Sequence, residues 1–429
     1  MGENPTPDQI RAFNDEMLAE ADNFLRERGI VSIGERRASL VKALDGEQKG
    51  RMDKLQKEVF NNLEEEIVRL PPVGRLNELL QLNGKFDPSA FPEGTDFQMV
   101  RPAFHTRFQH SELLAELAKV AAIKLGLSEK EIITMACAGW LHDIGHSAFS
   151  HSGEIVVLET EKDDHEKRTI DLLKKPEIQD FLRKFKVDIQ DVIDIVNEEG
   201  PLGTLQSVFD TLSYIVVDSE MFEKKLYPDS GAKLIGVLGS ISPDGQIVLQ
   251  DVEPWQQLIE TRAKMMKEYY YHPVSARSSG ALEQLLRLAI KGGYLTVDEL
   301  KNSGDDRIRL RIQSLVREDR GAALLSGRQE LAPYLSDYVD LFDVSLGFYD
   351  QRKWQQLKFS SKSELDNFLM TLEKEVSEKA IKVSPYDFTK KKITVTRKQQ
   401  DGNLEEVKLK SKNTELDEDN TKFTLYIPQ

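Results

Sequence analysis

An apolar stretch with helical periodicity, from residue 110 to residue 143, constrains the fold of this chain more than any other feature. Its apolar side chains recur every three or four residues, as on the buried face of a helix. The residues at that spacing are Leu113, Leu114, Leu117, Val120, Ala121 and Leu125. Gly126 is typical of a helix end, and Ser128 with Glu131 forms a capping box that starts a second helix. Because the second helix leads into His142-Asp143, the sequence predicts a buried helical pair with polar residues at one end.

The rest of the chain is also predicted to be mainly α-helical, with a small β-containing region at the C-terminus. Charge-rich amphipathic helices are expected before residue 70, and the Gly-, Pro- and Asp-rich residues 84–103 indicate a long loop. Further helices are expected near residues 165–185, 188–198, 205–223, 254–270, 275–291, 306–318 and 363–381.

Alternating residues 392–397 and 407–409 flank the turn Asp401-Gly402, and this pattern predicts a β-hairpin. Residues 423–427 are expected to add a third strand, and Pro243-Asp-Gly245 favours another short hairpin. We therefore divide the chain into four regions. They are an N-terminal helical region (1–70), a helical core (71–300), a helical extension (301–383) and a small β-hairpin region (384–429).

Composition places the chain among soluble globular proteins. Its hydrophobic content is 39%, which is ordinary for that class. The sequence has no run of about 18 apolar residues to span a membrane, and its N-terminus lacks the features of a signal peptide. The single cysteine, Cys137, cannot form an internal disulfide. We expect a cytoplasmic protein without a membrane partner, and the net charge of −15 disfavours nucleic acid as the main partner.

Five of the seven histidines fall between His110 and His165, which indicates a metal centre. A divalent cation that holds phosphate oxygens and water favours mixed imidazole and carboxylate ligands. His142 and Asp143 are adjacent at the end of a predicted helix, and His110 lies at the start of the preceding helix. If the two helices pack antiparallel, these side chains lie at the same end. Asp210, in an apolar helix, is a fourth candidate ligand.

Asp210 also begins a polar face on its helix. Asp210, Tyr214 and Asp218 are spaced i, i+4 and i+8, so their side chains share one face. An acid, a phenol and a second acid along one face of an apolar helix are typical of a site lining.

Each of these residues also has an ordinary structural interpretation. A His-Asp pair arises by chance in many chains, and His146 could be a helix-end residue that interacts with the helix dipole. Asp210 could be a capping or salt-bridging residue. Because the ordered set is much less expected by chance than any one member, we favour the metal centre.

The set His110, His142-Asp143 and Asp210 resembles the His…His-Asp…Asp pattern of the HD superfamily of metal-dependent phosphohydrolases. Within it, the chain is most similar to the deoxynucleoside triphosphate (dNTP) triphosphohydrolases, which include bacterial dGTPases and vertebrate sterile-alpha-motif/HD-domain enzymes. The run His105-Thr-Arg-Phe-Gln-His110-Ser resembles their H-x-R-F-E-H-S motif. The resemblance covers roughly residues 70–290, so region 71–300 is expected to be an HD core.

Further runs resemble motifs of the triphosphohydrolases. They are His146-Ser-Ala-Phe-Ser-His151-Ser-Gly-Glu154, Asp164-His165-Glu166, Arg75-Leu-Asn-Glu-Leu-Leu-Gln81-Leu82, and Tyr270-Tyr-His272 with Arg262 ahead of it. The helix that carries Asp210 departs from the family pattern D-x-x-D-Y-x-x-R-D. Ser213 replaces an acid and Val217 replaces an arginine. Thr211 stands where the vertebrate-type enzymes have a phosphate-binding lysine.

The resemblance implies a role for each matched residue. The implied metal ligands are His110, His142, Asp143 and Asp210. The residues implied to face the phosphates are His146, His151 and His165. Among these, His151 is the candidate acid that protonates the leaving oxygen, with Glu154 orienting it.

The resemblance also implies contacts with the substrate. Arg107 and Arg262 would bind phosphate oxygens through charge-assisted hydrogen bonds. The residues implied to recognise the sugar are Gln81, Leu82, Tyr214 and Asp218. Tyr270 or Tyr271 would contact the base.

Together these residues imply metal-dependent hydrolysis of a dNTP at its α-phosphorus, which gives a deoxynucleoside and tripolyphosphate. The departures at Thr211, Ser213 and Val217 leave an HD-type nucleotidase or another nucleotide phosphohydrolase as an alternative. A catalytically inactive nucleotide-binding regulator is less expected, because the ligand set is intact. We expect a divalent cofactor (Mn, Mg, Fe or Co), a nucleotide substrate that is a dNTP, and a homo-oligomer.

Overall fold

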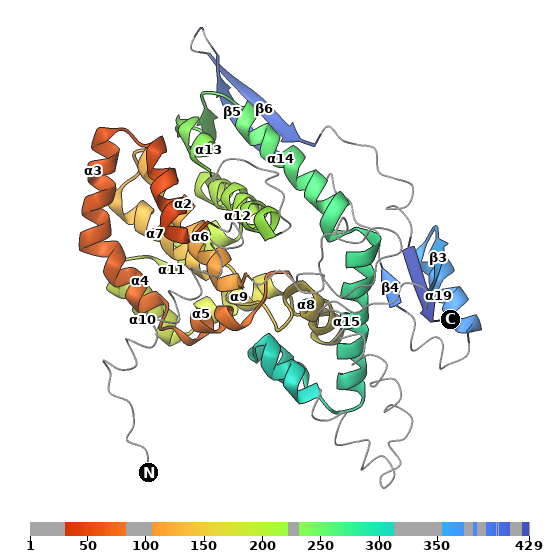
Figure 1. Ribbon diagram of the computed structural model, residues 1–429. Helices are drawn as coiled ribbons and strands as arrows, with labels where there is room; N and C mark the ends of the chain where they lie inside the picture. The colour runs from red at the N-terminus through yellow and green to blue at the C-terminus, as the bar shows by residue number, and fades with distance from the viewer. Residues whose placement is uncertain are drawn as a thin grey trace, which may run out of the picture.

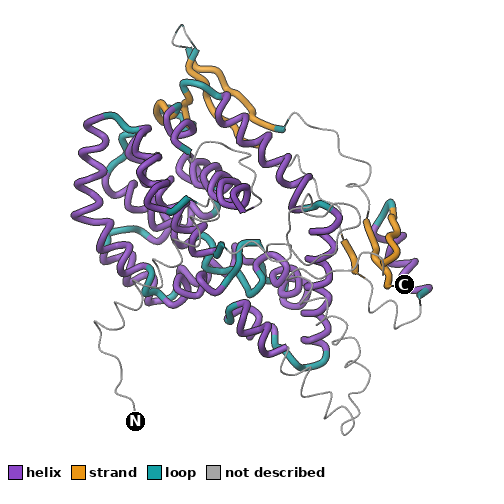
Figure 2. The backbone as a smooth tube through the Cα atoms, viewed as in Figure 1, coloured by secondary structure: helices purple, strands orange, loops and turns teal. Residues whose placement is uncertain are grey.

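Helices form most of the structure, and the strands lie in two small separate sheets at its periphery (Figures 1 and 2). The computed structural model describes residues 31–82, 105–221, 231–312, 354–372, 381–383, 392–399, 401, 403–411 and 423–428. The mainly helical fold with a small C-terminal sheet confirms the predicted fold class. Among these residues, no helix is both long enough and apolar enough to cross a bilayer.

The centre of the core is the predicted helical pair, α6 (Arg107–Lys124) and α7 (Glu129–Leu141). Both helices begin with a capping box, in which Thr106 or Ser128 accepts a hydrogen bond from the third helical residue. The two helices approach closely at Gly139, where an added Cβ would lie 2.7 Å from the Cα of Ala115. The capping box expected at Ser128 is confirmed, and so is the helix end near Gly126, which has a φ of 71°.

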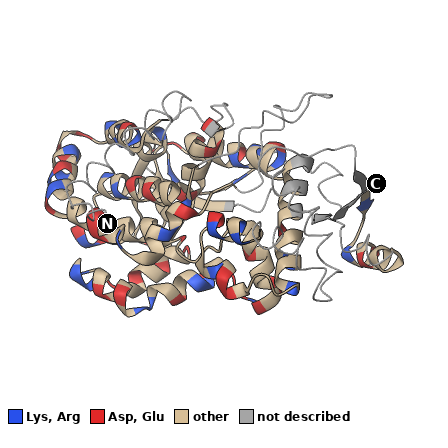
Figure 3. Ribbon diagram, turned by 60° about the horizontal axis from the view of Figure 1, so that its bottom comes forward, with Lys and Arg blue, Asp and Glu red and all other residues tan. Residues whose placement is uncertain are grey.

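Short N-terminal helices pack around this pair, and most of their leucines and isoleucines are buried. They are α2 (Ile33–Leu40), α3 (Gly46–Leu55), α4 (Asn61–Ile67) and α5 (Pro71–Arg75), with 3-10 segments at Val41–Ala43 and Leu76–Glu78 and a π segment at Gln56–Phe60. Basic and acidic residues are interspersed over the helical part of the structure (Figure 3). Helix α3 begins at Gly46, after the N-cap residue Asp45.

The chain after α7 forms further helices on the other side of the pair. They are α8 (Ser150–Glu161), α9 (His165–Leu173), α10 (Pro176–Lys184), α11 (Ile189–Val196), α12 (Gly200–Met221) and α13 (Ala232–Gly236). The segment predicted as one helix over 165–185 is two helices, because Pro176 starts a new one at its first turn. Helix α12 packs on α6 and α7, and this contact brings Asp210 towards the end of both helices.

A second group of helices packs beside α8 and α12. It contains α14 (Glu253–Met265), a π segment (Met266–Tyr270), α15 (Pro273–Lys291), α16 (Val297–Asn302) and helical residues 305–312. Leucines of α15 pack with Phe149 and Val157 in a second hydrophobic cluster. Because this cluster joins α15 to α8, the start of α8 and the face of α15 border the same space.

The predicted hairpins are confirmed and join in one sheet. Strands β1 (Leu238–Ile241) and β2 (Ile247–Leu249) form the first hairpin, and β5 (Lys392–Lys398) and β6 (Leu404–Lys410) form the second. The sheet order is β1-β2-β5-β6, with Val248 paired to Thr396 in a parallel register. The C-terminal hairpin therefore packs on the core and extends a sheet that begins more than 140 residues earlier.

The second sheet differs from the prediction. Residues 423–427 do not extend the hairpin, because β7 (Phe423–Pro428) pairs with β3 (Trp354–Phe359) and β4 (Ile381–Val383) instead. The helix expected to reach residue 381 is α19 (Lys362–Thr371) and ends ten residues earlier. Strands therefore lie within the region expected to be a helical extension. The loop expected at 84–103 lies outside the described residues, and the four-region division stays a prediction.

Candidate active site

Four side chains from three helices meet at one point beside the end of α7. His110 lies on the first turn of α6, His142 follows the last residue of α7 with Asp143 next to it, and Asp210 lies midway along α12. The Nε2 atom of His110 lies 3.1 Å from that of His142 and 3.0 Å from Oδ1 of Asp210. Oδ1 of Asp143 lies 3.3 Å from Nε2 of His142. The four residues predicted from the sequence as metal ligands are therefore brought together.

The hydrogen bonds behind the two imidazoles fix which nitrogen carries the proton. Nδ1 of His142 donates to the carbonyl oxygen of Gly139 at 2.9 Å. Nδ1 of His110 lies 2.9 Å from the hydroxyl of Ser213, which itself donates to the Asp210 carbonyl. The Ser213 oxygen therefore accepts from His110, so in the neutral form of both rings the Nε2 atoms carry no proton.

This donor set fits a divalent metal ion. Two unprotonated imidazole nitrogens face one another at 3.1 Å, and two carboxylates lie against them. Neutral imidazoles in this orientation cannot hydrogen-bond to each other, whereas a cation between them binds both. Histidine and carboxylate ligands together suit Mn, Fe, Co or Mg centres. The Ser213 hydroxyl contacts Nδ1 of His110 and so orients the ring.

Arg107 has a different contact from the one expected. Its Nη1 donates to Oδ2 of Asp143 at 2.7 Å, and its Nε donates to the Ser150 hydroxyl at 3.1 Å. Burial raises the pKa of Asp143, but its contacts with His142, Arg107 and His146 outweigh this effect and hold the pKa well below its usual range. Arg107 thus orients a metal-ligand candidate. Its Nη2 is buried without a hydrogen-bond partner, so this nitrogen is left for a substrate oxygen.

A second cluster lies next to the first and is organised by Glu154. One carboxylate oxygen lies 3.0 Å from Nδ1 of His151, and the other lies 2.5 Å from Nδ1 of His165. Burial lowers the pKa of His165, but the contact with Glu154 outweighs it and raises this pKa overall. Glu154 orients both rings, as expected for His151, and turns their Nε2 atoms away from the carboxylate.

His146 is placed differently from the prediction. We expected it to face the phosphates, but it is fully buried, does not line the cavity, and stacks on His165 with ring centroids 4.0 Å apart. Burial, with Arg107 and His165 nearby, lowers the pKa of His146 far below its usual range. Its position depends on Gly145, where a Cβ would lie 2.2 Å from the His165 carbonyl oxygen. His146 is therefore buried between the two clusters, where it stacks on His165 and lies 3.4 Å from Asp143.

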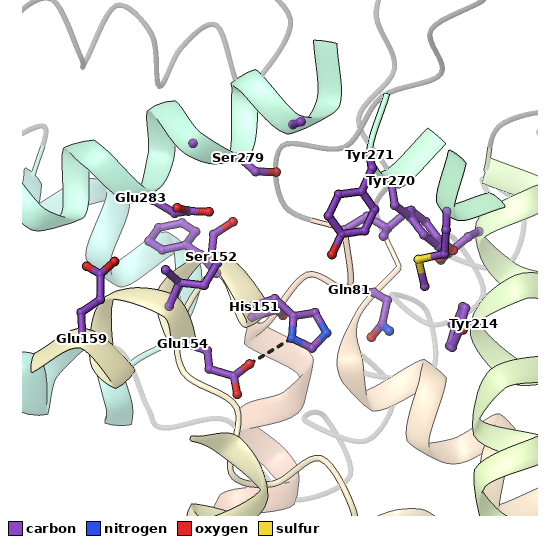
Figure 4. A pocket seen from close by; sticks show the side chains of 18 of the residues that line it. Gln81, His151, Ser152, Glu154, Glu159, Tyr214, Tyr270, Tyr271, Ser279 and Glu283 are labelled. Atoms are coloured by element: carbon purple, nitrogen blue, oxygen red, sulfur yellow. Dashed lines mark hydrogen bonds and ion pairs between the residues drawn. The ribbon is translucent and has the colours of Figure 1, made fainter. Parts of the chain in front are cut away.

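A cavity of about 1130 Å³ opens beside both clusters, between α8, α12, α14 and α15. Figure 4 shows His151 between two walls of it, with Gln81 and three tyrosines on one side and Ser152, Glu159, Ser279 and Glu283 on the other. Many of the predicted site residues line it. They are Gln81, Leu82, Arg107, His151, Glu154, Asp210, Tyr214, Asp218, Arg262, Tyr270 and Tyr271.

The wall with the tyrosines, formed by Gln81, Tyr214, Asp218, Tyr270 and Tyr271, is called the tyrosine wall below. Its groups are held by their own hydrogen bonds. Arg262, expected to bind phosphate, donates from Nε to the Tyr214 hydroxyl at 2.9 Å. Burial raises the pKa of Tyr214 to about 12, so its hydroxyl stays protonated. This wall offers aromatic faces beside hydroxyl and amide groups.

Sequence reasoning missed the opposite wall. Ser279, Glu283 and Arg287 of α15 line it, and α19 adds Lys362 and Asp366. Arg287 donates to Glu159 of α8 at 2.7 Å. The spacing of Glu283 and Arg287 indicates only a helix-surface ion pair, and nothing local in the sequence indicates that α15 packs beside α8.

Comparisons with known proteins agree with this geometry. Residues 107–209 match the HD domain family. The uncharacterized protein YdhJ of Bacillus subtilis is 23% identical over 299 residues, which cover 67% of this chain and 81% of that protein. The match to the HD domain spans α6 to the middle of α12 and includes His110, His142 and Asp143.

Two solved structures have a similar fold. A phosphohydrolase from Bacteroides thetaiotaomicron has a TM-score of 0.58 and 18% identity, and the match covers 85% of this chain and 95% of that one. A hypothetical protein from Aquifex aeolicus has a TM-score of 0.54 and 18% identity, covering 85% and 92%. Residues 107–209 thus match the HD domain family, and the chain shares its overall fold with both structures.

Proposed function

We propose that this protein is a metal-dependent phosphohydrolase that acts on nucleotides. The observation that carries the proposal is the pair of Nε2 atoms of His110 and His142, which face each other at 3.1 Å beside Asp143 and Asp210. These four residues would hold a divalent cation. When bound, the cation supplies Lewis acidity and positive charge for a phosphate oxygen.

His151 is positioned to protonate the leaving oxygen. Its side chain is 66% exposed, lines the cavity, and is held at Nδ1 by Glu154, so Nε2 can face a bound phosphate. A bound phosphate favours the protonated ring, because opposite charges raise the pKa of a histidine. Water then attacks phosphorus, the P–O bond breaks, and His151 gives its proton to the departing oxygen.

The most specific form of this proposal is a dNTP triphosphohydrolase that releases a deoxynucleoside and tripolyphosphate. It is supported by the tyrosine wall, where Gln81 and Tyr214 can hydrogen-bond a sugar and a tyrosine ring can stack on a base. The free Nη2 of Arg107 supports phosphate binding next to the metal ligands.

An HD-type nucleotidase, or another nucleotide phosphohydrolase, is the second candidate. Thr211 and Val217 supply no positive charge to α12, and Arg262 and Arg287 already have partners in Tyr214 and Glu159. A long phosphate chain needs compensating cations, so these residues favour a substrate with fewer phosphates.

One assay separates the candidates. The purified protein is incubated with each dNTP, ribonucleoside triphosphate and deoxynucleoside monophosphate, with Mn²⁺, Mg²⁺ or Co²⁺, and the products are identified by phosphorus NMR. Tripolyphosphate from any dNTP supports the triphosphohydrolase. Inorganic phosphate from monophosphates alone supports the nucleotidase, and no hydrolysis of any nucleotide with any cation overturns the proposal.

A further inference from the structure

His105 lies directly behind the tyrosine wall without lining the cavity. It is 2% exposed, and its Nε2 atom lies 2.7 Å from Oδ1 of Asp218, which is 1% exposed. These residues are 113 positions apart in the sequence, just before α6 and near the end of α12. The two atoms are in ion-pair contact without an aligned hydrogen bond. Burial holds the imidazole against the carboxylate, because a buried charge is costly to leave without a nearby partner.

Asp218 is held from its other side by Tyr270. The Tyr270 hydroxyl donates to Oδ2 of Asp218, while Oδ1 faces His105. The Tyr270 ring packs edge-on against Tyr214 at 6.2 Å between centroids. A continuous set of contacts therefore connects His105, through Asp218, to the two tyrosine rings that line the cavity.

The backbone of His105 also holds Gln81. The backbone N–H of Gln81 donates to the backbone carbonyl of His105 at 3.0 Å, next to the isolated β-bridge between Leu80 and Thr106. The Oε1 atom of Gln81 is buried without a hydrogen-bond partner, and its side chain lines the cavity. Buried acceptors of this kind are normally satisfied, so Gln81 Oε1 is available for a hydroxyl of the substrate.

We propose that His105 is a positioning residue that sets the discrimination between nucleotides differing by one sugar hydroxyl. The proposal rests on the proposed function and concerns the same cavity. The His105 imidazole contacts Asp218, which in turn binds Tyr270, so removal of the imidazole lets a carboxylate and a ring move together beside Gln81. A site built to hydrogen-bond a hydroxyl rejects analogues strongly only while its polar groups stay in place.

The experiment compares His105→Ala, His105→Gln and Tyr270→Phe with the unmodified enzyme. The value of kcat/KM is measured for the 2′-deoxy, ribo and 3′-deoxy forms of one nucleotide. The nucleoside-free ester bis(p-nitrophenyl) phosphate reports on the metal centre alone. Glu116→Gln is the matched control. It weakens a buried ion pair of helix α6, between Glu116 and Lys119, and neither residue lines the cavity.

We expect His105→Ala to reduce the ratio of kcat/KM between preferred and disfavoured nucleotides roughly 10- to 100-fold. Hydrolysis of bis(p-nitrophenyl) phosphate and metal content should stay unchanged. His105→Gln, which keeps an N–H donor, should restore part of the ratio. Tyr270→Phe should reduce it as well, and adding it to His105→Ala should cause little further loss because the two act through Asp218.

An equal loss for all substrates, or an unchanged ratio in both His105 variants, overturns the proposal. If His105→Ala does not fold, His105→Gln and Tyr270→Phe carry the test. Binding of the product nucleosides, measured by calorimetry, distinguishes this failure from failure of the proposed function. If the variants bind the different nucleosides with more similar affinities than the unmodified protein does, the role of His105 is supported even without turnover. If the variants and the unmodified protein discriminate equally between the nucleosides, the proposed role is excluded.

Discussion

Helix α6 carries buried charge in two places, and the two groups are built differently. Near its start lie the metal-ligand candidates His110, His142, Asp143 and Asp210. Further along the same helix lies a group that we call the α6 ion-pair cluster, formed by Arg37, Glu64, Glu112, Glu116 and Lys119. Both groups are largely buried, so both must satisfy their charges within the protein.

The α6 ion-pair cluster satisfies itself. Lys119 is 1% exposed and lies 2.5 Å from Glu116 and 2.6 Å from Glu64. Nε of Arg37 donates to the other Glu116 oxygen at 2.7 Å. Burial raises the pKa of Glu116, but Lys119 and Arg37 outweigh it and lower the pKa overall. Two of its three carboxylates, Glu64 and Glu116, are therefore paired with cations, and this cluster fastens the N-terminal helices to the core.

The metal-ligand group is matched only in part. Within the described residues, Arg107 pairs with Asp143, while Asp210 faces the Nε2 atoms of His110 and His142. Two imidazoles with unprotonated nitrogens then face each other without a shared proton. The comparison teaches that buried polar groups at a site that fits a cation are only partly paired within the protein, whereas Lys119 and Arg37 pair directly with the buried carboxylate of Glu116.

The largest expected effect comes from Asp143→Ala. It removes one ligand and the partner of Arg107, so we expect loss of the metal and at least about a 1,000-fold loss of turnover. Metal content is measured by mass spectrometry and turnover with the best nucleotide found. Glu116→Gln should keep both, although it breaks a buried pair of the same helix. Full activity of Asp143→Ala would show that this centre is not the catalyst.

His151→Ala separates the acid from the metal site. The imidazole touches Glu154 and the cavity but none of the four ligand candidates, so the metal content should not change. Turnover should fall by about 100- to 10,000-fold, as for the loss of a general acid. Retained turnover, measured at saturating substrate, would remove the role that we assign to His151.

Lys119→Met tests the α6 ion-pair cluster. The substitution leaves Glu116 buried with less compensation, and we expect a loss of about 3–5 kcal/mol in the free energy of unfolding, measured by denaturant titration. Lys54→Met is the matched control. It removes an exposed pair with Glu58 and should cost less than about 1 kcal/mol. A Lys119→Met protein that loses its metal while folded would contradict the separation of the two groups.

The smallest effect is a pH dependence at Glu112. Burial, reinforced by Glu116 and Glu64, raises its pKa from 4.5 to about 7. A carboxyl whose pKa is raised by folding stabilises the folded state below pH 4.5, and this contribution is lost as the pH rises to about 7. Relative to wild type, Glu112→Gln should therefore gain up to about 3 kcal/mol between pH 4 and pH 8. Parallel stability curves over this range would contradict the prediction.

The sequence by itself determined the helices around the site and the identity of the clustered residues. Capping boxes at Ser128 and Thr106, and the apolar spacing between them, act within a few residues, so local pattern is enough. The choice of His110, His142-Asp143 and Asp210 also came from the sequence, although from order and spacing rather than from geometry. Their convergence required the packing of α12 on α6 and α7.

Only the tertiary structure decided which partner each residue takes. Ser213, a departure from the family pattern, holds His110; Arg107 binds Asp143; and β7 joins β3 and β4. His105 and Asp218 meet from opposite ends of the HD domain. Hydrogen-bond geometry and strand pairing between distant segments depend on how whole helices and sheets pack. Local periodicity, which carries the sequence signal, holds no information about those contacts.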